Sequence, residues 1–319
     1  MNCAKTAPLA GLLCALLSFG LTLSESATRA FSQTQNSPAL SVDVDLVLLN
    51  TTVTDSQNRL VAGLAKESFQ IWEDKIEQEI QYFSSENVPL SVGIIFDTSG
   101  SMQNKLTDAR TAANTFLRMG EKEDEYFLVE FSNSPHLVTD LTTDITKLQN
   151  RLLLTRANGM TSLYDAMYLG LERVGHGNNA RKALLLITDG EDNHSRYSFS
   201  DVKEFAKEHD VQIYAIGIVD ESIPGSAYSG GRALLEDLAK LTGGRAFFPT
   251  SAQELEGICA AIGVELKNQY VLGYRPSNRL ADGKWRKIKV KINRTKGMPS
   301  LSVRTKTGYY AFQTAGAMK

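Results

Sequence analysis

Residues 90–102 read LSVGIIFDTSGSM, an almost continuous apolar run that ends in a cluster of oxygen-bearing side chains. An apolar run without polar alternation is typical of a strand that is buried on both faces of a sheet. The run ends at Asp97, and a helical pattern of apolar residues begins soon afterwards, at residues 107–119. The stretch therefore predicts a strand, a loop and a helix in succession, with the polar cluster on the loop at the carboxyl end of the strand.

The same alternation of strands and helices continues through the middle of the chain. KALLLIT, at residues 182–188, and VQIYAIGIV, at residues 211–219, also have the composition of fully buried strands. Further strands are expected at residues 125–131, 136–142 and 245–249, and helices at residues 145–154, 163–174, 202–207, 233–241 and 252–266. This order predicts an α/β fold with a doubly wound, mostly parallel central sheet and helices on both faces, as in Rossmann-like folds.

Strand patterns dominate both flanks of this middle section. On the amino-terminal side, apolar and polar residues alternate from residue 40, and two short strand candidates follow on either side of Asp74 and Lys75. On the carboxyl-terminal side, strands are expected in QYVLGYRP, WRKIKVKI and LSVRTK. We expect the two flanks, residues 40–88 and 269–319, to pair into one small β-rich module beside an α/β domain at residues 89–268.

The first thirty residues have the pattern of a secretory signal peptide. A lysine at position 5 precedes an apolar run over residues 8–23, and small residues follow it. The alternative is an uncleaved membrane anchor, since the run approaches the shortest length that spans a bilayer. Residues 31–39 are expected to form a linker. We therefore expect an exported protein of a bacterial cell envelope, periplasmic or extracellular, whose contact with a membrane would come only from this segment if it is not cleaved.

Cysteine usage is consistent with that expectation. Two of the three cysteines fall in the predicted signal peptide, so the mature chain keeps only Cys259 and cannot form an internal disulfide. Export without disulfides fits a bacterium better than a eukaryotic secreted domain. Cys259 lies among apolar residues at helical spacing and is expected to be a small buried side chain.

Oxygen-bearing side chains follow two of the buried strands. Asp97, Ser99 and Ser101 follow the first, and Asp189 follows the strand at residues 182–188. Between them in the chain, a glycine-led loop carries Thr161 directly before a helix. Because the carboxyl ends of parallel strands meet at one edge of a sheet, we expect these side chains to converge there.

The sequence motifs that contain these five residues resemble the metal-ion-dependent adhesion site of von Willebrand factor A domains. That site is recognised by D-x-S-x-S after the first core strand, G-x-T before a middle helix and T-D-G after the fourth strand, and all three are present in this order. The resemblance covers roughly residues 88–268, the size of one domain. The flanks, with VDVDLVLLNTTVTD, FQIWEDKIEQEIQYF and QYVLGYRP, resemble a bacterial von Willebrand factor A-related family abundant in acidobacteria.

The resemblance implies a metal site with a defined division of roles. The hydroxyls of Ser99, Ser101 and Thr161 would bind Mg²⁺ directly, with Mn²⁺ or Ca²⁺ as alternatives, while Asp97 and Asp189 would act mainly through water. Mg²⁺ prefers six oxygen ligands, and neutral hydroxyls leave most of its charge uncompensated. A position open to solvent would then accept a Glu or Asp carboxylate from a partner protein. The implied function is a metal-dependent protein-binding or adhesion module, not an enzyme.

Two other functions are kept open by the sequence. The first is a structural scaffold of an envelope complex, in which the metal serves only the fold. The second is a Mg²⁺-dependent hydrolase in which Asp97 and Asp189 activate water. The net charge of −2 gives no electrostatic case for binding nucleic acid. The four histidines lack the spacing of a zinc site.

Three further features have ordinary structural interpretations. Asp165, Glu191 and Asp192 are expected to be surface carboxylates, with an added negative field at the site as the alternative. Residues 225–231, GSAYSGG, are expected to form a flexible loop. Lys287, Lys289 and Lys291 alternate with apolar residues, which predicts a solvated strand face that guards a sheet edge. The alternative for these lysines is contact with a membrane surface or an anionic polymer.

Overall fold

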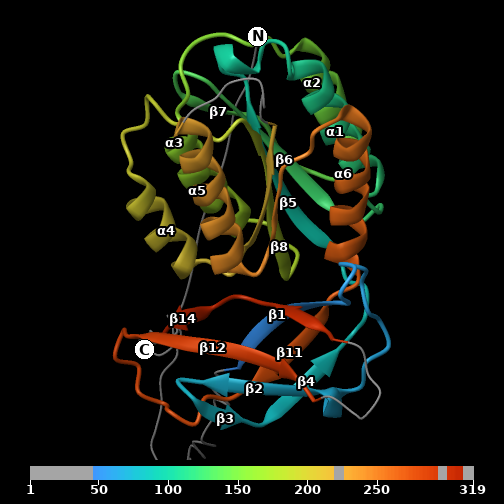
Figure 1. Cartoon of the computed structure of the whole chain (residues 1–319), viewed down its shortest axis with the longest axis vertical. Coiled ribbons are helices and arrows are strands. Elements are labelled where there is room, and N and C mark those ends of the chain that lie inside the picture. The colour runs from blue at the N-terminus through green and yellow to red at the C-terminus, as the bar shows by residue number, and fades with distance from the viewer. Residues whose placement is uncertain (1–45, 219–225, 294–299, 312–319) are drawn as a thin grey trace, which may run out of the picture. The chain divides into compact units, whose positions relative to one another are not determined.

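The centre of the structure is a six-stranded sheet with the strand order β10-β9-β8-β5-β6-β7 (Figure 1). It belongs to a computed structural model that describes residues 46–218, 226–293 and 300–311. Strand β5 pairs in parallel with β6 and β8, and β8 pairs in parallel with β9, whereas β7 is antiparallel to β6. The prediction of a mostly parallel central sheet is therefore confirmed. The strands are β5 (Leu90–Asp97), β6 (Glu125–Phe131), β7 (Pro135–Thr142), β8 (Arg181–Thr188), β9 (Gln212–Gly217) and β10 (Ala246–Phe247).

Helices cover both faces of this sheet (Figure 1). One face packs against α1 (Leu106–Arg118), α2 (Ile145–Leu154) and α6 (Ala252–Lys267). The other packs against α3 (Leu163–Gly175), α4 (Phe199–Glu208) and α5 (Ser226–Thr242). Strand β5 shows why its sequence is apolar throughout: Ile94 and Phe96 enter the first core and Ile95 the second. A strand between two helical layers has no solvated face on which polar residues could alternate.

The start of α5 differs from the prediction of a flexible loop. Helix α5 begins at Ser226, so the described part of the GSAYSGG segment is helical. A Cβ atom added at Gly231 would lie 2.6 Å from the carbonyl oxygen of Gly190. The glycine at position 231 is therefore required for close contact between two backbones, which explains its presence within a helix.

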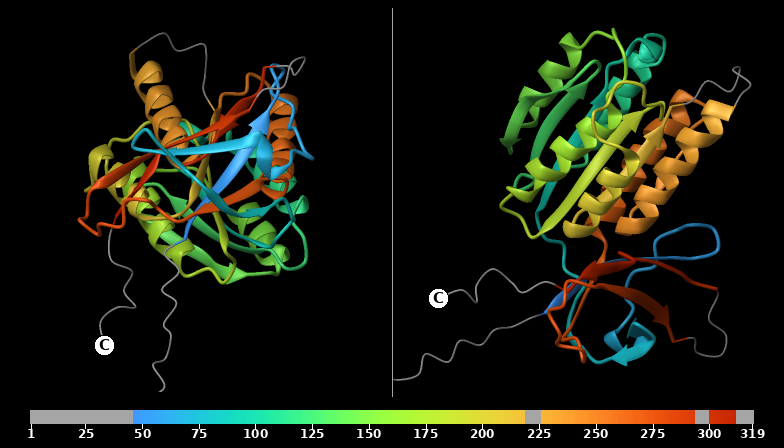
Figure 2. Two further views of the ribbon diagram at one scale, coloured as in Figure 1. Left: turned by 90° about the horizontal axis from the view of Figure 1, so that it is seen from below. Right: turned by 90° about the vertical axis from the view of Figure 1, so that its left-hand side faces the viewer.

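Two antiparallel four-stranded sheets form the β-rich module. Their strand orders are β13-β1-β11-β4 and β14-β12-β2-β3, and one hydrophobic core, which includes Leu49, Ile71 and Leu272, contains residues from both. Strands from the two flanks lie side by side: Thr51 of β1 is opposite Tyr270, and Ile71 of β2 is opposite Val290 (Figure 2). The expected pairing of the two flanks is confirmed. The strands are β1 (Val47–Thr54), β2 (Phe69–Glu73), β3 (Ile76–Gln78), β4 (Ile80–Ser84), β11 (Tyr270–Tyr274), β12 (Trp285–Ile292), β13 (Ser302–Arg304) and β14 (Gly308–Tyr310).

The lysine-bearing strand β12 lies between β14 and β2 in the strand order of its sheet. It pairs with β14 over Trp285–Lys287 and with β2 over Ile288–Ile292. The prediction of a solvated strand face is confirmed, because the lysines are exposed and the residues between them are buried. Beyond Ile288, β12 is paired on the β2 side alone. Pairing between strands more than two hundred residues apart determines which strand lies at an edge, and the sequence pattern of a single strand carries no such information.

Two buried polar groups join the module to the α/β domain. The Arg181 guanidinium, at the start of β8, donates hydrogen bonds to the carbonyl oxygens of Glu86, Leu266 and Gln269 at 3.1 to 3.3 Å. It thereby holds both connections between the two parts of the chain. The Glu265 carboxylate at the end of α6 accepts the Tyr214 hydroxyl at 2.7 Å.

The Glu265 carboxylate also forms an ion pair with Arg304 at 2.7 Å. This pair connects the last helix of the α/β domain to strand β13 of the module.

Across the described ranges, no helix is both long and apolar enough to cross a bilayer. The predicted signal peptide and linker, residues 1–39, lie outside the described residues.

Candidate metal centre

Asp97 is fully buried at the end of β5 and links two of the predicted site loops. Its Oδ1 accepts the backbone N–H of Ser99 at 2.9 Å. Its Oδ2 accepts the hydroxyl of Thr188, at the end of β8, at 2.5 Å. The neighbouring parallel strands thus place the T-D-G loop beside the D-x-S-x-S loop. Thr188 was not predicted as a site residue, although it is the first residue of the T-D-G motif.

A short 3₁₀ turn, η2 (Gly100–Met102), follows β5; Ser99 precedes this turn as its N-cap residue and Ser101 lies within it. The hydroxyl oxygens of Ser99 and Ser101 are 3.0 Å apart. Adjacent ligands of an octahedral Mg²⁺ with bonds near 2.05 Å would be roughly 2.9 Å apart. The spacing of the two hydroxyls therefore fits two neighbouring positions around such an ion.

The loop that carries Thr161 is fastened to the serine loop through the backbone. The N–H of Gly100 donates to the carbonyl oxygen of Gly159 at 3.0 Å, and the N–H of Asn158 donates to the carbonyl oxygen of Thr98 at 2.8 Å. Gly159 has a φ of +85°, the left-handed conformation that glycine adopts without strain. The glycine of the G-x-T motif therefore makes the turn that places Thr161 after this contact.

Thr161 is also fixed from its other side by the loop that follows β8. Its N–H donates to the side-chain oxygen of Asn193 at 2.8 Å. Its carbonyl oxygen accepts the N–H groups of Asn193 and His194, both at 3.0 Å. The structure thus joins all three predicted loops at the carboxyl edge of the sheet. Asn193 was not predicted as a site residue, because it acts by hydrogen bonds to the backbone of Thr161, and no sequence motif includes such contacts.

Asp189 has one satisfied and one unsatisfied carboxylate oxygen. Its Oδ2 lies 3.4 Å from the ammonium of Lys105, at the start of α1. Its Oδ1 is buried and has no hydrogen-bond partner among the described residues. A buried carboxylate oxygen without a donor is costly unless a cation or an ordered water satisfies it. Lys105 was also missed by the motif analysis, although it is the first cationic residue after D-x-S-x-S.

The electrostatics of the site favour a cation. Burial, together with the nearby charge of Asp189, raises the pKa of Asp97 to about 6, against the lowering effect of hydrogen bonds from Ser99 and Thr188. Two buried carboxylates that repel each other are stabilised by a positive charge between or beside them. No group of three His, Cys, Asp or Glu side chains in the described part of the chain could hold a metal. A metal at this edge would therefore depend on the hydroxyl groups.

The three additional carboxylates do not form one group. Asp165 is buried rather than at the surface, which corrects the prediction: its oxygens accept the N–H groups of Arg196 and Tyr197 at 2.9 and 3.1 Å. Asp192 accepts the Ser195 hydroxyl at 2.5 Å. Glu191 is exposed, as expected. Asp165 and Asp192 thus hold the loop after β8 in place.

The comparisons with known proteins match this chain over different lengths. A family model described as von Willebrand factor type A domain matches residues 92–191. None of the curated proteins matches the chain. Among solved structures, a von Willebrand factor type A protein from Catenulispora acidiphila is 13% identical with a TM-score of 0.49, covering 85% of this chain and 74% of that chain.

Two other solved structures cover a smaller share of this chain. The conserved hypothetical protein BatB from Bacteroides thetaiotaomicron is 15% identical with a TM-score of 0.46, covering 56% of this chain and 98% of that chain. The vWF domain of the type V pili tip protein Mfa5 from Porphyromonas gingivalis is 14% identical with a TM-score of 0.45, covering 56% of this chain and 97% of that chain. From the family-model match over residues 92–191, which include strand β5 and the T-D-G loop, we conclude that this chain contains a von Willebrand factor type A domain.

Proposed function

We propose that the chain is an exported protein-binding module that holds Mg²⁺ at the carboxyl edge of its sheet and captures an acidic side chain of a partner. Ser99, Ser101 and Thr161 would contribute their hydroxyl oxygens as ligands. Asp97 and Asp189 would balance the charge and hold water at the site. Mn²⁺ and Ca²⁺ are the alternative ions.

The observation that carries this proposal is the unsatisfied Oδ1 of buried Asp189, at an edge where the serine and threonine loops are hydrogen-bonded together. When bound, a divalent cation would supply positive charge to that oxygen and an open position to an incoming carboxylate. Asp97 orders the serine turn through the N–H of Ser99, so the ligand hydroxyls are positioned before a metal arrives.

The first test is calorimetric titration of the chelated and dialysed protein with MgCl₂ and MnCl₂. The expected result is saturable binding at one site, and loss of binding in the double variant Ser99→Ala, Ser101→Ala. Ser200→Ala, an exposed serine on α4, is the control that should bind normally. A folded wild-type protein that takes up neither ion would reject the proposal.

The same double variant distinguishes binding from a scaffold role. A binding site at the surface predicts a variant that stays folded, with its urea midpoint little changed in metal-free buffer. A structural metal predicts a wild type that is strongly stabilised by Mg²⁺ and a variant that unfolds much earlier.

The second test concerns the carboxylate. With Mn²⁺ bound, a carboxylate that displaces coordinated water lowers the proton relaxation enhancement of the solvent. Millimolar acetate should lower it, whereas acetamide, a neutral molecule of similar shape, should not. Equal effects of the two would contradict carboxylate capture while leaving metal binding intact.

Export is proposed from the pattern of residues 1–30 alone. Expression of the full chain in a bacterial host should give a shortened protein outside the cytoplasm, with an amino terminus following Ser26 or Ala30. Full-length protein in the membrane fraction would favour the anchor alternative.

A further inference from the structure

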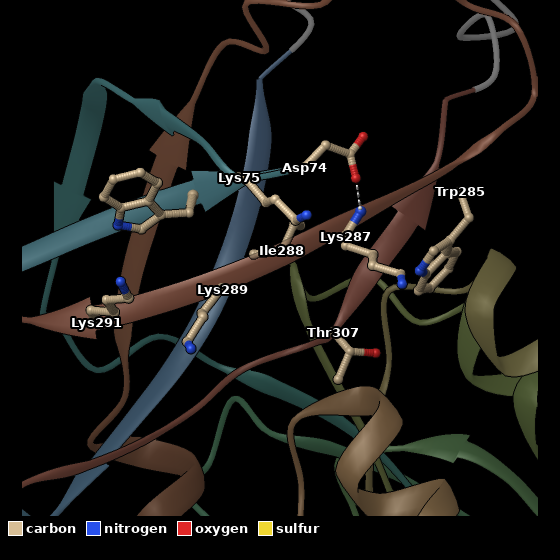
Figure 3. A pocket seen from close by; sticks show the side chains of 9 residues that line it. Asp74, Lys75, Trp285, Lys287, Ile288, Lys289, Lys291 and Thr307 are labelled. Atoms are coloured by element: carbon tan, nitrogen blue, oxygen red, sulfur yellow. Dashed lines mark hydrogen bonds between the residues drawn. The ribbon is translucent and has the colours of Figure 1, made fainter.

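A concave surface of about 860 Å³ lies on the β-rich module, away from the motifs described above (Figure 3). It lies over the outer face of β12 and β2 and the turn that joins β2 to β3. Its lining combines two tryptophans with four lysines, a composition found in none of the three hydrophobic cores. We call this surface the lysine–tryptophan groove; it is lined by Trp72, Lys75, Trp285, Lys287, Lys289 and Lys291, together with Asp74, Ile288 and Thr307.

The lysines form a regular row. Lys287, Lys289 and Lys291 are exposed and alternate with buried residues of β12, so they point from the same face of the strand. Alternate residues of a strand are separated by roughly 6.6 Å, so the row presents three ammonium groups along about 13 Å. Lys75 adds a fourth from the hairpin turn. The row thus has the form of a linear track of positive charge.

These charges are largely uncompensated. Among the described residues, no carboxylate lies within ion-pair distance of any of the four lysines, whereas the arginine at position 286 of the same strand pairs with Asp282. Asp74 is the acidic residue of the groove, and its Oδ1 accepts the backbone N–H of Lys287 at 3.0 Å. Glu77 of β3 lies opposite Trp72 and outside the lining. A row of unpaired ammonium groups attracts a ligand that carries repeated negative charges.

The tryptophans add two partly exposed aromatic rings to the track, and the Trp285 ring also contacts Tyr310 and the Lys207 ammonium. Trp72 is opposite Lys289, and Trp285 begins the same strand, so the two rings are separated by about four residues of β12, or roughly 13 Å. The Lys291 ammonium lies 4.8 Å from the Trp72 ring centroid. The indole nitrogen of Trp72 is buried without a hydrogen-bond partner in the described structure. Partly exposed rings beside charged groups are typical of ligand contacts that combine stacking with polar recognition.

We infer that this groove binds a linear acidic polysaccharide, a polymer of sugar rings that carry carboxylate or sulfate groups. The rings of such a polymer have apolar C–H faces that can stack on Trp72 and Trp285, and its anionic groups can pair with the lysine row. Lysine suits this ligand because its compact charge on a flexible stem tolerates irregular spacing of the anions. A neighbouring cavity of about 440 Å³ shares Lys289 and Thr307, which extends the path available to a long chain.

The geometry disfavours the other anionic partners. A peptide that adds to a sheet needs an unpaired edge, and β12 offers one only beyond Ile288 on the side of β14, because it pairs with β14 over Trp285–Lys287 and with β2 over Ile288–Ile292. A flat bilayer surface does not enter a concave groove. The polysaccharide uses only side chains on the face of the sheet, and these are the groups that the groove offers.

The test is binding of the full chain to polygalacturonate and to dextran sulfate, with neutral dextran as the uncharged reference. All titrations contain EDTA, so that metal binding at the edge of the central sheet is silent. We expect both anionic polymers to bind and neutral dextran not to bind, with affinity falling as salt is raised. Equal binding of neutral dextran would overturn the inference.

Two sets of variants locate the contact. Lys287→Glu combined with Lys289→Glu should weaken polygalacturonate binding by about tenfold or more, because two attractions become repulsions. The double change Lys66→Glu, Lys122→Glu alters the net charge equally at exposed positions outside the groove, and binding should stay within about twofold. Equal losses in both double variants would show non-specific charge attraction and overturn the inference.

The tryptophans provide an independent measurement. Trp72→Ala and Trp285→Ala should weaken binding without altering its salt dependence, since they remove stacking and no charge. Circular dichroism and a urea midpoint confirm that each variant is folded. Stronger binding of polyglutamate than of polygalacturonate, or sedimentation with phosphatidylglycerol vesicles in the absence of polymer binding, would identify a peptide or a membrane as the partner and overturn the inference.

Discussion

Lys105 places a positive charge among the oxygens that we assign to Mg²⁺. Its ammonium is 3.4 Å from Asp189 Oδ2 and is mostly buried. A bound cation must therefore share Asp189 with a like charge. We expect Lys105→Met to tighten Mg²⁺ binding by about three- to tenfold, since the repulsion is removed and the carboxylate is released.

Calorimetry on the chelated protein measures this effect. Lys122→Met, at an exposed position outside the site, is the matched control and should leave the affinity unchanged. Weaker binding by the Lys105→Met variant would mean that the lysine organises the site instead of competing with the ion.

The pKa of Asp97 predicts how the stability of the metal-free protein depends on pH. Burial raises this pKa from 3.8 to about 6, so between these values the folded protein holds a proton that the unfolded chain has lost. The free energy of unfolding should therefore fall as the pH rises from 4 to 6, with up to about 3 kcal/mol lost by pH 7.

Urea unfolding in EDTA at pH 4.5, 5.5 and 7 tests this prediction by comparison with Asp97→Asn, which cannot ionise. The difference between the two proteins should shift in favour of the variant as the pH rises. Saturating Mg²⁺ should oppose the shift, because a cation stabilises the ionised carboxylate. Parallel pH profiles in EDTA would contradict a raised pKa at Asp97.

Residues within a motif were predictable from the sequence, whereas residues that act through tertiary contacts were not. Asp97, Ser99 and Ser101 occur within five positions, so one short pattern identifies them. The burial of Asp165 depends on the N–H groups of Arg196 and Tyr197, some thirty residues away. No local pattern contains that information.

Among the elements, the beginning of α5 connects helix packing to the site. Gly231 of this helix contacts the backbone of Gly190, which follows Asp189, and an added Cβ would lie 2.6 Å from its carbonyl oxygen. We expect Gly231→Ala to destabilise the fold by about 1 to 3 kcal/mol and to weaken Mg²⁺ binding, because the loop after β8 must shift.

The preceding glycine is a matched control. A Cβ atom at Gly230 would meet nothing within 4 Å, so Gly230→Ala should be neutral or stabilising by up to about 1 kcal/mol through its better helix propensity. Urea titration and calorimetry of both variants provide the measurements. Equal stabilities would contradict the close approach of the two backbones.

Helices and buried strands were predictable as elements because their periodicity is local. Helix α2 occupies the predicted residues 145–154, and β5 follows the apolar run that begins at Leu90. The neighbours of each strand were less predictable. The central position of β12 depends on pairing with Phe69–Glu73, which its own alternation of lysines and apolar residues does not reveal.

For the whole molecule, Arg181 is the group that holds the two parts of the chain together. Its guanidinium contacts the carbonyl oxygens of Glu86, Leu266 and Gln269. Removal of the donors leaves buried carbonyl oxygens unsatisfied, so Arg181→Met should lower the free energy of unfolding by about 2 to 4 kcal/mol. Lys182→Met, which removes one exposed hydrogen bond to Gly175, is the control and should cost less than about 1 kcal/mol.

Urea unfolding followed by tryptophan fluorescence is well placed to detect the loss, because Trp72 and Trp285 both lie in the β-rich module. If the module separates from the α/β domain in the Arg181→Met protein, the fluorescence transition, which reports the module, should occur at a different urea concentration from the circular dichroism transition, which reports both parts. A single unchanged transition would show that the other contacts between the parts are sufficient.

The pairing of β1 with β11 affects the order in which the strands of this protein can pair during synthesis. Tyr270 emerges from the ribosome about 220 residues after its partner Thr51, a delay of roughly 10 to 45 s at ordinary rates of synthesis. Until then β1 and β4 lack their shared partner β11, whereas β2 can already pair with β3. By the end of the interval, every strand of the central sheet has been made. The central sheet can therefore pair before the sheet that contains β1 and β11 is complete, and β1 is the strand that waits longest for its first partner.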